Sequence, residues 1–195
     1  TGTSFDVQRY MYHVQSAFGL AYLDDVVRAH ERLEHAVKKS RSSMLAWVQL
    51  MRAVLYQARA LLALARAAKE PSSRAFLVKR ALADAKRMER ENQAWTRAGA
   101  AVIRANAEAL RGRRSHALSY FDVAIEECER ARMSGRAMSS RWAKGIIVGG
   151  REGELLVSVA RRYFDEQEVA DPVRLVRNLA PVLFADDPAA LFARD

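Results

Sequence analysis

Apolar residues recur at intervals of three and four along almost the whole chain, which is the period of an amphipathic α-helix. Short polar, Gly-containing or Pro-containing segments interrupt this pattern. We therefore predict about nine helices, covering approximately residues 5–23, 26–40, 43–69, 71–91, 94–111, 115–133, 137–148, 150–168 and 171–183. The alternating runs and frequent turns of a strand-rich protein are absent from the sequence, so the predicted fold class is all-α.

Four positions give the clearest helix boundaries. Ser42 or Ser43 can accept hydrogen bonds from the free N–H groups of a long helix that reaches about Lys69. Pro71 stops that helix, and Gly149-Gly150 ends the seventh one and lets the chain reverse. Asp171-Pro172 suits a helix start, because Asp caps the free amides and Pro has no N–H to leave unbonded.

Consecutive helices with short connections pack as antiparallel hairpins. We place three hairpins at about 5–40, 43–91 and 94–134, then C-terminal helices within 137–183 and a tail over 184–195. A small-x3-large-x2-small spacing recurs in their second helices, at Ala29, Leu33 and Ala36, at Ala117, Phe121 and Ala124, and more weakly at Ala81, Ala85 and Met88.

This spacing resembles the second helix of a tetratricopeptide repeat (TPR), where small residues let the paired helix approach closely. The step from Ala81 to Ala117 is 36 residues, near the period of such repeats, whereas the step from Ala29 to Ala81 is 52. We predict a single TPR-like region over residues 1–195, a short curved solenoid of antiparallel hairpins. The alternative is that amphipathic hairpins produce the spacing by chance.

The composition limits the compartment and the class of the protein. The 195 residues suffice for one domain or a short repeat array. A single cysteine, Cys128, excludes a disulfide framework, and no apolar run approaches the roughly 20 residues of a membrane helix. We therefore expect a cytoplasmic protein with no membrane insertion. The chain begins at Thr1 without methionine, and we interpret it as part of a longer protein.

The net charge of +9 is unevenly distributed. Residues 40–91 contain 11 Lys and Arg against 4 Asp and Glu, whereas residues 152–195 contain 5 basic and 9 acidic residues. Such asymmetry can orient a charged partner without identifying it.

The C-terminal segment carries a more specific pattern. It reads Gly149-Gly150-Arg151-Glu152-Gly153, then Tyr163-Phe164, Asp171-Pro172 and Leu179-Ala180-Pro181. This order resembles the closing segment of multidomain bacterial serine/threonine protein kinases, whose kinase domain is followed by a TPR-like helical region, or of related sensor-linked ATPases. Arg151 departs from the family pattern, which often has an acidic residue there. The resemblance implies a C-terminal interaction or regulatory region without catalytic residues of its own.

Other candidate sites have simpler structural interpretations. His30 and His35 lie five residues apart, about 140° around a helix, which does not suit a metal site; we expect them exposed and in contact with Glu34 and Glu31. The glycines at 149–153 lack the Lys-Ser or Lys-Thr of a phosphate-binding loop.

We expect Cys128 in the core. We also expect the three tryptophans, Trp47, Trp95 and Trp142, to pack the hairpins together. We predict no catalytic residue, metal or cofactor.

Arginine is the best candidate for function. One set recurs every seven residues in the third helix and another does so through the fifth; the candidate interaction surface is Arg52, Arg59, Arg66, Arg90, Arg97, Arg104 and Arg111. Seven residues are nearly two helical turns, so each set forms a stripe on one face. The stripes are either solvated faces or the lining of a groove that binds an acidic or phosphorylated peptide, since guanidinium groups bind carboxylate and phosphate bidentately.

The sequence therefore predicts a non-catalytic protein-interaction or regulatory module that binds a protein or peptide. The alternative is nonspecific nucleic-acid binding through the basic middle of the chain, which would weaken steeply with salt. The acidic C-terminal segment and the lack of a nucleic-acid-binding motif favour the first hypothesis.

Overall fold

A computed structural model describes residues 7–40, 47–184 and 191–192, which contain nine α-helices and no strand. The all-α prediction is confirmed. The helices are α1 (Val7–Tyr22), α2 (Val26–Ser40), α3 (Gln49–Lys69), α4 (Arg74–Arg90), α5 (Ala94–Leu110), α6 (Arg114–Arg130), α7 (Ser134–Val148), α8 (Gly150–Glu166) and α9 (Pro172–Leu179). Two short 3-10 helices, η2 (Pro71–Ser73) and η3 (Pro181–Phe184), precede α4 and follow α9.

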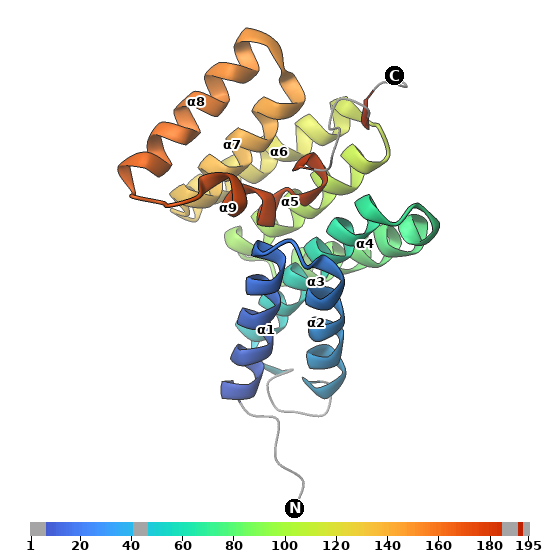
Figure 1. The fold of residues 1–195 in the computed structure, drawn as a ribbon. Helices are drawn as coiled ribbons and strands as arrows, with labels where there is room; N and C mark the ends of the chain where they lie inside the picture. Colours follow the sequence, from blue (N-terminus) through green and yellow to red (C-terminus); the bar gives the residue numbers. More distant parts are fainter. Residues whose placement is uncertain (1–6, 41–46, 185–190, 193–195) are drawn as a thin grey trace, which may run out of the picture.

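Each helix from α1 to α7 packs against the next one along the chain, and the short connections make these neighbours antiparallel (Figure 1). The odd-numbered helices also contact one another, α1 with α3 and α3 with α5. We call the face formed by α1, α3, α5 and α7 the inner face. The even-numbered helices pack on its other side.

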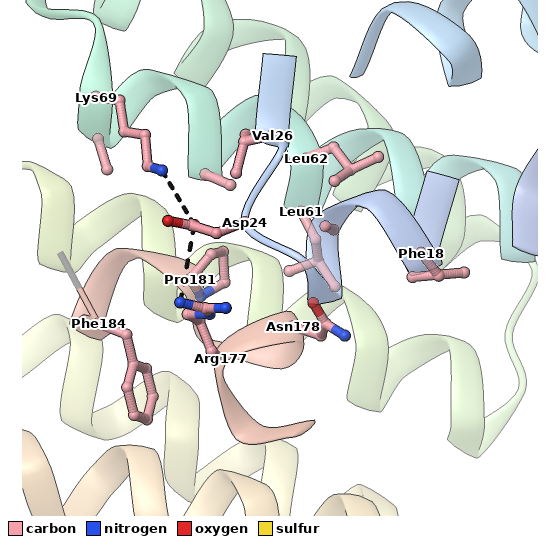
Figure 2. Close-up of a pocket in the computed structure, with 13 residues that line it drawn as sticks. Phe18, Asp24, Val26, Leu61, Leu62, Lys69, Arg177, Asn178, Pro181 and Phe184 are labelled. Carbon is pink, nitrogen blue, oxygen red and sulfur yellow. Dashed lines mark hydrogen bonds and ion pairs between the residues drawn. The ribbon is translucent and has the colours of Figure 1, made fainter. Parts of the chain in front are cut away.

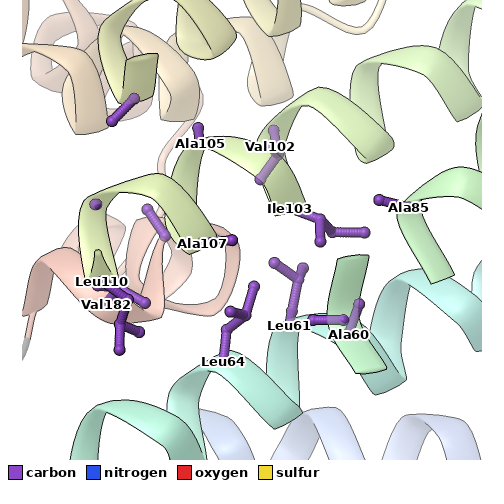
Figure 3. Packing of buried hydrophobic residues seen from close by; sticks show 14 of the residues in the cluster. Ala60, Leu61, Leu64, Ala85, Val102, Ile103, Ala105, Ala107, Leu110 and Val182 are labelled. Atoms are coloured by element: carbon purple, nitrogen blue, oxygen red, sulfur yellow. The ribbon is translucent and has the colours of Figure 1, made fainter. Parts of the chain in front are cut away.

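Alanine-rich packing around α5 forms the main core. Apart from Ala94, Trp95, Arg97 and Arg104, every residue of α5 is buried, because α3, α4, α6 and η3 surround it. Figure 3 shows Ile103 and Ala107 of α5 on the side that faces Leu61 of α3 and Ala85 of α4. Small side chains permit short distances between helix axes, so this core is dense although it contains few aromatic rings.

The residues of the predicted small-large-small spacing are all completely buried. The sequence analysis missed a fourth instance at Gly153, Val157 and Ala160 of α8. A Cβ atom built on Gly145 of α7 would lie 2.7 Å from the carbonyl oxygen of Gly153, and a Cβ on Gly153 would meet the carbonyl oxygen of Gly145. Helices α7 and α8 are therefore in backbone contact, and both glycines are required for it.

The structure corrects three expectations. The third helix begins at Gln49, because Val48 is extended with ψ 114°, so it is shorter than predicted; Ser42 and Ser43 lie outside the described residues. Trp47 is 85% exposed and packs no hairpin, although Trp142 is buried against Phe164. His30 is buried rather than exposed, because its face of α2 packs within the molecule.

The C-terminal segment does not extend the array of hairpins. It returns across the inner face, where α9 contacts α1 and α7 and η3 contacts α3, α5 and α7 (Figure 1). As predicted, α9 starts at Asp171-Pro172, and Asp171 Oδ1 accepts a hydrogen bond from the Arg174 amide at 3.0 Å.

Gly149 ends α7 with a φ of +66°, in agreement with the predicted chain reversal. Arg114 of α6 stabilises the same helix end by donating hydrogen bonds to the Ile147 and Val148 carbonyls. Within the described ranges, no helix has the length and apolar character needed to cross a lipid bilayer.

Replacement of Gly153 with Ala tests the backbone contact between α7 and α8. The added methyl group forces the two helices apart, and we expect a loss of about 1–3 kcal/mol in the free energy of unfolding. Chemical denaturation measures this loss. Gly19→Ala in α1 is the control, because a Cβ there meets nothing within 4 Å and should stabilise the helix slightly. Equal stability of the two variants would contradict the proposed contact.

Candidate functional site

The inner face binds the α9–η3 segment (residues 172–184) through both apolar and polar contacts. Val176, Ala180, Val182 and Leu183 of this segment are at most 1% exposed. The buried Asn106 of α5 donates from Nδ2 to the Leu179 carbonyl at 3.2 Å, and its Oδ1 accepts from the Val182 amide at 3.5 Å. Because these bonds reach main-chain atoms, the inner face holds a peptide backbone as well as side chains.

Charged contacts connect the same segment to the N-terminal hairpin. Arg177 donates to the Tyr22 carbonyl at 3.2 Å and lies 3.8 Å from Asp24, which also accepts a hydrogen bond from Lys69 at 3.0 Å. Figure 2 shows these three side chains together at a small pocket lined also by Phe18 and Phe184. The end of α1 is thereby linked to both α3 and α9.

A second, larger pocket of about 460 Å³ opens on the inner face. Four helices contribute to its lining, which consists of Phe18 from α1, Gln57 and Leu61 from α3, Gly135, Arg136 and Ser139 from α7, and Leu175, Asn178 and Leu179 from α9. Its volume lies in the range of small-ligand sites. We call it the Arg136 pocket.

Arg136 is the single charged residue among the described residues that line this pocket. Its Nη1 donates to Gln57 Oε1 at 2.9 Å, and no carboxylate forms an ion pair with it within the described part of the chain. Arg136 is exposed to solvent where it lines the pocket, and its partial burial by surrounding protein lowers the pKa of the guanidinium. The group remains charged at neutral pH, so the pocket presents at its mouth one positive charge without a carboxylate partner in the described chain.

The arginines of the two stripes have a different environment, and none of them lines the Arg136 pocket. Six form ion pairs with carboxylates of this chain: Arg52 with Glu91, Arg59 with Asp84, Arg66 with Glu70, Arg97 with Glu127, Arg104 with Glu89 and Arg111 with Glu108. Arg90 is exposed and forms no ion pair among the described residues. Ligand binding by the stripes stays a prediction, and a ligand would have to compete with these carboxylates.

Arg59 is the most buried arginine of the stripes. Its Nε and Nη2 donate to the two oxygens of Asp84 at 2.7 and 2.5 Å, which joins α3 to α4. Burial acts to lower the pKa of Arg59, but the hydrogen bonds and charge of Asp84 outweigh it and raise the pKa. Arg59 is 6% exposed, so it does not belong to a solvated helix face.

The remaining candidates take structural positions. Cys128 is buried as predicted, and burial raises the pKa of its thiol to about 11, which makes it a poor nucleophile. Burial also lowers the pKa of His30, whose Nε2 lies 3.8 Å from Glu34. No cluster of three His, Cys, Asp or Glu side chains suited to a metal ion occurs in the described ranges.

Sequence analysis did not identify Asn106 or Arg136 as site residues. Asn106 lies in a helix that was predicted correctly, whereas Arg136 precedes the predicted start of the seventh helix, which begins at Ser134 instead of about residue 137. The importance of both residues depends on the return of α9 across the inner face. The one available signal was an uncharged polar residue, Asn106, between two alanines of an alanine-rich helix, since a buried amide requires a hydrogen-bonding partner.

Comparisons of the chain with protein-family models, with curated proteins and with solved structures gave no match.

Asp84→Asn tests the structural importance of Arg59. The substitution removes the carboxylate that compensates a buried guanidinium, and we expect a loss of about 3–5 kcal/mol in the free energy of unfolding. The matched control is Glu89→Gln, which removes the partner of the more exposed Arg104 and should cost less than about 1 kcal/mol. Urea denaturation followed by circular dichroism gives both values. Similar small losses would show that Arg59 needs no partner.

Asn106→Leu tests how the inner face holds α9–η3. We expect a loss of about 1–3 kcal/mol, because the Leu179 carbonyl and the Val182 amide lose their partner. Hydrogen exchange at Val182 should accelerate more than exchange within α5. Asn178→Leu is the control, since this half-buried amide forms no hydrogen bond within the described chain. Unchanged exchange at Val182 in Asn106→Leu would refute the role of Asn106.

Proposed function

We propose that this chain is a non-catalytic protein-interaction module that binds peptide segments on its inner face. The observation that carries the proposal is the docking of α9–η3 on that face. There Asn106 bonds to main-chain atoms and apolar side chains such as Val176 and Leu183 are buried. A surface that binds one segment of its own chain in this way has the chemistry needed to bind a segment of another protein.

We further propose that the hairpins form a TPR-like solenoid. The buried small-large-small sets support this proposal, and the first small residues of the last three sets, Ala81, Ala117 and Gly153, are 36 residues apart. Solenoids of this type bind partners on extended inner surfaces. The sequence resemblance supports a regulatory region of a bacterial serine/threonine protein kinase or a sensor-linked ATPase, acting in the cytoplasm.

Nucleic-acid binding is less favoured because most arginines of the basic middle segment already have carboxylate partners. Each phosphate contact requires an available cation. Arg52, Arg59 and Arg66 would have to exchange their partners for phosphates, and Arg59 is buried as well.

Gly135→Leu tests the proposed function. A Cβ on Gly135 meets nothing within 4 Å, so the larger side chain should enter the mouth of the Arg136 pocket without unfolding α7. The matched control is Gly19→Leu, at an exposed position of α1 with similar free space. The measurement is affinity capture from a lysate of the source cell, with and without nuclease, using the unmodified chain and both variants.

We expect a discrete set of proteins that resists nuclease, is retained by Gly19→Leu and is reduced at least tenfold by Gly135→Leu. Retention that disappears with nuclease would favour nucleic-acid binding instead. Equal capture by both variants would place the binding surface away from this part of the inner face.

A further inference from the structure

Arg136 has no carboxylate partner among the described residues, unlike six of the seven stripe arginines, and it lines a pocket that none of them lines. The guanidinium is fixed on one side by Gln57 Oε1 at 2.9 Å, and its other N–H groups form no hydrogen bond within the described chain. Gln57 is itself 4% exposed and is a neighbour of Gly99 in α5, so its position is fixed. The guanidinium is therefore oriented before any ligand binds.

The residues that line the pocket indicate which chemical groups a ligand needs. Its apolar lining consists of Phe18 and Leu61 together with Leu175 and Leu179 of the docked α9. Such a lining favours an apolar group, while the single cation requires an anion. The pocket also opens at the first turn of α7, where Gly135 is a lining residue, and the helix dipole adds positive potential there.

The balance of charge distinguishes a carboxylate from a phosphate group. A carboxylate carries one negative charge, which Arg136 can neutralise through two parallel hydrogen bonds. A phosphorylated side chain carries about −1.5 to −2 at neutral pH, and no second cation is among the described residues that line the pocket. Arg136 alone would therefore neutralise a carboxylate more completely than a phosphate group.

We propose that Arg136 binds the carboxylate of an Asp or Glu side chain in a partner protein, and that a neighbouring apolar side chain of the same peptide packs between Phe18, Leu61 and Leu179. This inference rests on the proposed function and specifies its partner. We assign the carboxylate to a side chain because the proposed function is the binding of peptide segments, whose carboxylates belong mostly to Asp and Glu side chains. Gln57 is a positioning residue for Arg136.

The test is a selection from a phage-displayed library of random dodecapeptides against the immobilised full chain. Each peptide is fused to the coat protein at its C-terminus, so the carboxylates presented by the peptide belong to side chains. The selected peptides are then synthesised, and their affinities are measured for the unmodified chain, Arg136→Gln and Arg162→Gln. Arg162 is the matched control, because it is exposed on α8 and lies outside the Arg136 pocket.

We expect the selected peptides to share an acidic residue beside a large apolar one. Arg136→Gln should weaken their binding at least tenfold, Arg162→Gln less than twofold, and exchange of the peptide acid for its amide should cause no further loss in Arg136→Gln. Circular dichroism should show the same helicity in all three proteins, since Arg136 forms no ion pair in the described chain.

Three results would overturn this inference: selected peptides without an acid, equal binding to Arg136→Gln, or no enriched peptide at all. Peptide binding that survives Arg136→Gln but is lost in Gly135→Leu would leave the proposed function standing and refute only the carboxylate site. Failure of the capture experiment with Gly135→Leu would count against the proposed function itself.

Discussion

Close packing of small side chains around α5 determines the geometry of this molecule. Helices α3, α4 and α6 and the η3 turn all approach α5, and residues such as Ala100, Ala105 and Ala107 leave no volume for larger groups. Van der Waals contact over many alanines replaces the large aromatic core of other helical proteins. Because α5 is enclosed, every hairpin after the first takes its position directly or indirectly from it.

The same enclosure explains the arginine spacing of this helix. After its first two residues, α5 is buried except at Arg97 and Arg104, which reach Glu127 of α6 and Glu89 of α4. A long side chain can leave a closely packed helix border and place its charge beside a carboxylate on the adjacent helix. The seven-residue spacing of these arginines is therefore explained by ion pairs between packed helices. Arg136, in contrast, forms no ion pair in the described chain.

The sequence was sufficient to predict the helices and the residues at which most of them pack, because the 3.6-residue period and the small-large-small spacing are local properties. The start of α3 was predicted too early, since serine capping potential alone does not ensure a helix. The return of α9–η3 could not be predicted, because it depends on contacts between residues as distant as Tyr22 and Arg177. Asn106 and Arg136 acquire their roles only through that return.

The path of the C-terminal segment also affects how the protein unfolds. In an open array of hairpins each unit contacts only its neighbours, and stability is close to a sum of local contributions, so terminal units can melt separately. Here α9 contacts both α1 and α7. The first and last hairpins therefore share a structural element, and loss of either one exposes the apolar surface of the other. This closure gives a repeat-like chain the cooperativity of a globular domain.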